Sequence, residues 1–129
     1  SIRAMAPFEV QRLLRILDTK AVEINSTALV KRFLDSAMLL ILPNSVVATF
    51  ELKITSDDRL FWSWKAGECF AFKGMSRMGV IGKYECGVMF RVECWMRELG
   101  LVYRAVPQVT ACMMHETGYC RGEYQFDFR

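Results

Sequence analysis

The stretch Val46–Lys65, VVATFELKITSDDRLFWSWK, decides the expected fold of this chain. Apolar residues occupy every second position of its first half, a period typical of a strand that is buried on one face. These residues are Val46, Ala48, Phe50, Leu52 and Ile54. The segment TSDD indicates a turn, and Leu60, Trp62 and Trp64 continue the alternation after it. The stretch therefore predicts an antiparallel hairpin.

Two amphipathic helices are expected before this hairpin. Pro7 stands at a first-turn position, and apolar residues then recur at helical spacing. The residues of that stripe are Val10, Leu13, Leu14, Leu17 and Ala21. The second helix is predicted to begin after an N-cap at Asn25 or Ser26 and to end before Pro43. Its apolar face holds Leu29, Val30, Phe33, Leu34, Ala37 and Met38.

The second half of the chain predicts strands around one long helix. After Gly67 the segment ECFAF suggests a short strand, and the three glycines between Lys73 and Lys83 indicate a loop. A helix is predicted from Tyr84 to Gly100, followed by a strand over 101–112 that is interrupted at Pro107. The last strand places three aromatic residues on one side, namely Tyr124, Phe126 and Phe128.

The expected fold class is therefore α+β, in one domain that spans residues 1–129. Two N-terminal helices precede an antiparallel sheet of four to five strands, and one long helix precedes a C-terminal hairpin. At 129 residues a single hydrophobic core is expected.

Composition excludes several classes of partner. No run approaches the roughly 18 apolar residues of a membrane span. The net charge of +3 comes from 17 basic and 14 acidic residues that are interspersed, so no clustered basic surface for nucleic acid is predicted.

No segment resembles a secretory leader, which favours a cytoplasmic protein. Five cysteines are an odd number, so a complete disulfide framework within one chain is excluded.

The segment CMMHETGYC, Cys112–Cys120, surrounds the only histidine of the chain. Because Cys112 is expected at the end of one strand and Cys120 at the start of the next, their side chains are predicted to lie close enough to share a zinc ion. Two other readings stay open, since free cysteine is often a small buried hydrophobe and an exported protein would favour a Cys112–Cys120 disulfide.

A third ligand has to come from elsewhere in the chain. The candidates are Cys69, Cys86, Cys94 and His115. Cys86 and Cys94 are separated by about 12 Å along one helix, so a single metal ion cannot bind both. Cys86 is preferred because it is expected in the first helical turn, where backbone amides and the helix dipole favour a thiolate.

The segment Tyr84–Phe128 resembles the C-terminal part of the vinyl-4-reductase-like domain, a sensor region of some phenol-responsive regulators. In that family a cysteine at a helix start, a second after the next strand and a third after a short loop hold zinc together with a glutamate. Cys86, Cys112 and Cys120 match this order and the family's intervals of 26 and 8 residues. The stretch GECFAFKGMSRMGVIGKYECG is similar, more loosely, to L-2-amino-thiazoline-4-carboxylic acid hydrolase-like proteins.

The sequence departs from the zinc-binding pattern at one ligand. Val109 stands where the family has its glutamate, so the fourth ligand has to be His115, Glu116, Cys69 or water. We expect a zinc site of Cys86, Cys112, Cys120 and His115.

The resemblance implies a domain that binds an apolar or aromatic small molecule and forms a homodimer. Aromatic and sulfur-containing side chains are available to wall a pocket, namely Trp62, Trp64, Phe70, Phe72, Met89 and Trp95. The alternative function is a hydrolase of a small heterocyclic or thiol-containing substrate. It would use Cys69 as the nucleophile or an open zinc site, with His115 or Glu68 as the base.

Overall fold

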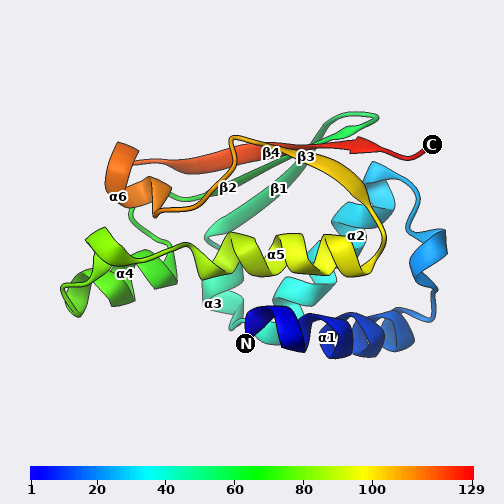
Figure 1. Ribbon diagram of the computed structural model, residues 1–129, viewed down its shortest axis with the longest axis horizontal. Coiled ribbons are helices and arrows are strands. Elements are labelled where there is room, and N and C mark those ends of the chain that lie inside the picture. The colour runs from blue at the N-terminus through cyan, green and yellow to red at the C-terminus, as the bar shows by residue number, and fades with distance from the viewer.

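A computed structural model describes all residues, Ser1–Arg129. The chain forms an α+β fold in which a four-stranded antiparallel sheet covers a set of helices (Figure 1). The strands are β1 (Phe50–Ser56), β2 (Arg59–Trp64), β3 (Val102–Val106) and β4 (Cys120–Asp127). The helices are α1 (Ile2–Leu17), α2 (Thr27–Ile41), α3 (Asn44–Val47), α4 (Phe70–Arg77), α5 (Gly87–Glu98) and α6 (Met113–Thr117), with 3₁₀ turns at Ala21–Glu23 and Ile81–Lys83.

The sheet has the strand order β1-β2-β4-β3, so β2 and β4 are central and β1 and β3 are edges. Strand β2 pairs with β1 through the predicted turn and with β4 on its other side, where Trp62 lies opposite Gly122. The inner face of β2 buries Leu60, Trp62 and Trp64, as the alternation predicted. In Figure 1, α5 and α2 lie beneath the sheet, and α1 lies beneath α5.

Both N-terminal helices form, but the bounds of the first differ from the prediction: α1 begins at Ile2, so Pro7 lies inside it rather than in its first turn, and it ends at Leu17, before Ala21. Ser26 is the N-cap of α2, and its side-chain oxygen accepts a hydrogen bond from the amide of Leu29. Helix α2 ends at Ile41, before Pro43. The apolar faces of both helices pack into the core, where Val10, Leu13 and Phe33 are among the buried residues. These two faces supply most of the buried apolar side chains in the N-terminal half.

Two strand predictions are wrong. The strand expected from Val46 begins only at Phe50, because Asn44–Val47 form the short helix α3 after Pro43. The segment ECFAF is not a strand: Cys69 is the N-cap of α4, and Phe70 is its first residue. Five residues were too few to separate a buried strand from the start of a helix.

The region after α4 follows the prediction in part. Helix α5 begins at Gly87 with Cys86 as N-cap, rather than at Tyr84, and buries Met89, Val92 and Trp95. Strand β3 ends at Val106, next to a cis peptide bond to Pro107, and is an edge strand as the proline suggested.

The expected strand over 101–112 does not reach Cys112. This residue is the N-cap of α6, a helix in the segment that was expected to be a loop. Cys120 therefore has Trp64 of β2 as its partner in the sheet, and Cys112 does not lie opposite it. None of the helices has the length and apolar character that crossing a membrane requires.

Candidate functional site

Three consecutive helices begin at a cysteine. Cys69, Cys86 and Cys112 are the N-cap residues of α4, α5 and α6, and Cys120 is the first residue of β4. We call these four residues the cysteine cluster. Cys86 is partly buried, and the other three are buried in the core, each about 7% exposed. Helices α4 and α6 and the start of α5 lie at the same end of the molecule (Figure 1).

Three contacts fasten the segments that carry these cysteines to one another. The amide of Cys86 donates to the carbonyl oxygen of Thr110 over 2.7 Å, two residues before Cys112. The amide of Gly67, two residues before Cys69, lies 3.3 Å from the sulfur of Met114 in α6. The third contact joins the start of β4, which carries Cys120, to α6. The amide of Arg121, next to Cys120, lies 3.4 Å from the sulfur of Met113.

The cluster members also influence one another electrostatically. Burial raises the pKa of Cys120 to about 12, and the charges of Cys86, Cys69 and Cys112 act in the same direction. Burial likewise raises the pKa of Cys69 and of Cys86. At both of these residues, amides in the first helical turn oppose that rise, as expected for a sulfur at a helix N-terminus.

The other sulfur and nitrogen candidates lie apart from the cluster. The pKa of Cys94 is raised by burial, and the charges that act on it belong to Arg97, Arg3, Glu93 and Glu98. His115, a predicted ligand, is exposed on α6, and its Nε2 would lie 4.0 Å from a Cβ built on Gly82. The histidine has no hydrogen bond or ion pair with any cysteine.

In kind and number, the four thiols suit a soft divalent metal such as zinc, which prefers thiolate ligands. The structure does not place their side chains as a formed metal site. No group of three or more His, Cys, Asp or Glu side chains surrounds a common point at which a metal ion would be held. All five cysteines are free thiols, so the Cys112–Cys120 disulfide is also absent.

A second feature is an apolar cavity of about 410 Å³ beside the cluster. Its walls come from the N-terminus of α1, the C-terminal end of α2, one side of α4 and the first turns of α5. Eleven of the fourteen lining residues are hydrophobic. A volume of this size lies in the range of small-molecule sites, which are mostly apolar with a few polar groups.

The structure brings only part of the predicted pocket together. Phe70 and Trp95 line the cavity. Trp62, Trp64 and Met89 are buried elsewhere in the core, and Phe72 packs against that core without lining the cavity. Aromatic residues at strand spacing here fill the space beneath the sheet.

Sequence reasoning missed most of the cavity because it misassigned α4. This helix contributes four lining residues, namely Phe70, Ala71, Gly74 and Met75, and its C-cap residue Met78 is a fifth. Their spacing of one, three or four residues is helical and was the signal available in the sequence. Helix α4 has no fully buried residue, and Met78 is 73% exposed. An apolar wall is thus left largely open to solvent.

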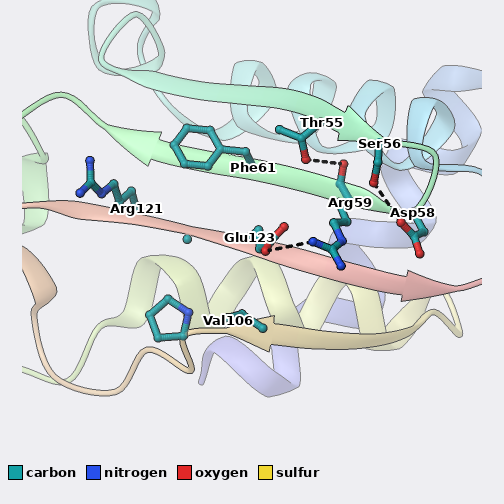
Figure 2. Close-up of a pocket in the computed structure, with 10 residues that line it drawn as sticks. Thr55, Ser56, Asp58, Arg59, Phe61, Val106, Arg121 and Glu123 are labelled. Atoms are coloured by element: carbon teal, nitrogen blue, oxygen red, sulfur yellow. Dashed lines mark hydrogen bonds and ion pairs between the residues drawn. The ribbon is translucent and has the colours of Figure 1, made fainter.

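A broader hollow lies on the outer face of the sheet (Figure 2). Its volume is about 820 Å³, but only two of its ten lining residues are hydrophobic. Its polar side chains mostly pair with one another: Arg59 approaches Glu123 at 4.0 Å, and Ser56 donates to Asp58 over 3.0 Å. This face has the polar character of an antiparallel sheet exposed to water on one side.

Comparison of the chain with known protein families, with curated proteins and with solved structures finds no match in any of the three. The similarity of the C-terminal segment to the vinyl-4-reductase-like domain therefore stays a prediction.

Proposed function

We propose that this chain is a small-molecule binding domain that holds an apolar or aromatic ligand between α4 and α5. The observation that carries the proposal is the apolar cavity, with its eleven hydrophobic lining residues and its volume of about 410 Å³. A ligand in this cavity would remove apolar surface from water, which favours binding by a free energy of roughly 25 cal/mol for each Å².

The structure of the walls also supports ligand binding over plain packing. Phe70 of α4 is 39% exposed and the C-cap residue Met78 is 73% exposed, although burial of a large apolar side chain stabilises a fold. Met75 and Met78 are flexible thioethers that adapt to ligands of different shape.

Gly74 offers a direct test, because it lines the cavity and a Cβ built on it has no atom within 4 Å. Gly74→Leu would place a side chain in open space and favour the helix by roughly 1 kcal/mol. We expect the neutral fluorophore N-phenyl-1-naphthylamine to bind the wild-type protein and to bind Gly74→Leu at least about tenfold more weakly.

Ser76→Leu is the matched control, since Ser76 is exposed on the same helix and does not line the cavity. It should leave binding unchanged, as measured by fluorescence titration. Absence of binding to the wild type, or equal binding to both variants, would contradict the proposed cavity site.

A zinc ion bound by the cysteine cluster is the second part of the proposal. It is supported by the four thiols at the starts of α4, α5, α6 and β4. In addition to burial, the charges of other cluster members raise the pKa of Cys69, Cys86 and Cys120. Cys69 takes the fourth position in place of His115, which is exposed. Because no three of these side chains surround a common point in the structure, zinc binding requires them to move, and it would supply a closed structural site that fixes three helix starts.

Metal content per chain tests this part, measured by plasma emission on protein prepared without chelator or affinity-tag metal. We expect about one zinc per chain, as for a closed four-ligand site, and its loss in Cys69→Ala, Cys86→Ala and Cys120→Ala. Cys94→Ala is the control and should keep the metal. No zinc in the wild type would refute the site. Zinc that survives Cys69→Ala but not His115→Ala would restore His115 as the fourth ligand.

The hydrolase alternative has weaker support. A nucleophilic thiol needs a lowered pKa, whereas burial raises the pKa of Cys69. Its neighbour Glu68 forms an ion pair with Lys73 at 2.8 Å, which lowers the pKa of that carboxyl and makes it a poorer base. The homodimer and the cytoplasmic location stay predictions.

A further inference from the structure

The apolar cavity contains one charged side chain, that of Arg91. No acidic residue lines it, and the only hydroxyl in its wall is that of Tyr84. Arg91 lies one turn after Gly87 on the same face of α5, and the amide of Gly87 donates to the Tyr84 oxygen over 3.0 Å. The two polar groups of the cavity therefore lie on either side of the start of α5, Tyr84 three residues before Gly87 and Arg91 one turn after it.

Arg91 is held in a fixed orientation from outside the cavity. Its Nε and Nη2 atoms both donate to the carboxylate of Glu9 on α1, which also accepts a hydrogen bond from Trp95 Nε1 over 3.2 Å. Glu9 lines a neighbouring hollow between α1 and α2, together with Arg12, and does not line the cavity. A carboxylate with three donors holds its guanidinium partner firmly.

This arrangement leaves hydrogen-bond donors without acceptors at the cavity. Arg91 Nη1 makes no hydrogen bond with the protein, and the Tyr84 hydroxyl accepts one without donating one. The cavity thus offers a cationic donor and a phenol donor, but no acidic side chain to receive a donor from the ligand.

We propose that the ligand is an apolar acid, whose carboxylate binds Arg91 and Tyr84 while its hydrocarbon or aromatic part fills the cavity. This inference rests on the proposed function and adds the chemical class of the ligand. A hydrogen bond between ionised partners is about twice as strong as a neutral one, so the acid is favoured over an uncharged molecule of the same shape. An alcohol would fill the same apolar space without that gain.

Matched acid and alcohol pairs test the inference: 4-phenylbutyrate against 4-phenylbutanol, and decanoate against decanol. Each compound is titrated at pH 7.5 against protein loaded with N-phenyl-1-naphthylamine, and displacement is followed by fluorescence. In the wild type we expect at least one acid to bind about tenfold more tightly than its alcohol, the ratio that one charged hydrogen bond supplies.

The variants assign this preference to Arg91. Arg91→Gln should bring acid and alcohol to similar affinity, whereas Arg77→Gln, which removes an exposed charge from α4 outside the cavity, should leave the preference intact. The wild-type comparison needs no variant, so it decides the ligand class even if Arg91→Gln folds poorly.

Three results would overturn the inference, and they separate it from the proposed function. Equal binding of acid and alcohol to the wild type would refute the acid class while leaving the cavity site in place. An acid preference that persists in folded Arg91→Gln would remove Arg91 from the site. Failure of the fluorophore and of all four compounds to bind would refute the cavity site itself.

Discussion

The amide of Cys86 donates a hydrogen bond of 2.7 Å to the carbonyl oxygen of Thr110, and so joins the start of α5 to the segment that leads into α6. An isolated bridge between Glu85 and Ala111 extends this contact. Residues that are more than twenty positions apart thus meet at the cysteine cluster. The apolar cavity lies next to it, because the residues that follow Cys69 and Cys86 form two of its walls.

Cys120 should react slowly with alkylating reagents in metal-free, folded protein. Because burial raises the pKa of Cys120 to about 12, only about one molecule in 10⁴ carries its thiolate at pH 8. We expect the alkylation rate of Cys120 by iodoacetamide to rise about tenfold per pH unit between pH 8 and 11, as the thiolate fraction does. Mass spectrometry of chelator-treated protein measures it, and a rate that levels off near pH 9 would contradict the raised pKa.

The same raised pKa predicts how stability depends on pH. The folded state keeps the Cys120 proton to higher pH than the unfolded state, whose thiol has a pKa of about 8.5. Its contribution to stability is therefore complete below that value and is lost as the pH rises towards 12. Urea unfolding of metal-free protein at pH 8 and pH 10.5 should show lower stability at the higher pH. The decrease should be smaller in Cys120→Ala.

Gly122→Ala should destabilise the fold. A Cβ on Gly122 would lie 2.9 Å from Cζ2 of Trp62, its partner across the sheet, and Trp62 is about 1% exposed. Overpacking of a core commonly costs about 1 to 3 kcal/mol. Gly74→Ala is the matched substitution, since its Cβ meets nothing within 4 Å and alanine favours a helix by roughly 1 kcal/mol. The urea concentration at the midpoint of unfolding should fall for Gly122→Ala and rise for Gly74→Ala. Equal midpoints would contradict the packing at Trp62.

Tyr103→Phe should weaken the attachment of β3 to α5. The Tyr103 hydroxyl donates over 2.8 Å to Glu93, a carboxylate only 3% exposed, which also accepts from Gln108 over 3.1 Å. Burial and this carboxylate raise the pKa of Tyr103 well above its usual value, so the hydroxyl stays a donor throughout the neutral range. Loss of a hydrogen bond to a charged group costs about 1.5 to 3 kcal/mol.

Chemical denaturation of Tyr103→Phe measures that loss. Tyr119→Phe is the control, because Tyr119 is exposed and its hydroxyl makes no hydrogen bond with the protein. Equal stability of the two variants would show that Glu93 is satisfied without Tyr103.

The α+β class, the hairpin of β1 and β2 and the three long helices could be predicted from the sequence. Each rests on a period of two or of 3.6 that extends over six or more residues, and local caps such as Ser26 mark the boundaries. The short helices α3 and α6 could not be predicted, because four or five residues give too few repeats of either period, and the helical spacing available in α4 extends over only eight residues. The cysteines were recognised as a group by spacing, but Cys112 was placed on the wrong kind of element.

The sequence by itself determined which faces of the strands and long helices are apolar, since side-chain periodicity is a local property of the backbone. Only the tertiary structure decided which cysteines share one end of the molecule, that His115 is exposed apart from them, and that α4 and α5 enclose a cavity with Arg91 in its wall. These relations depend on contacts between distant segments, such as Gly67 with Met114. No local pattern encodes them, because they arise from the packing of elements around the core.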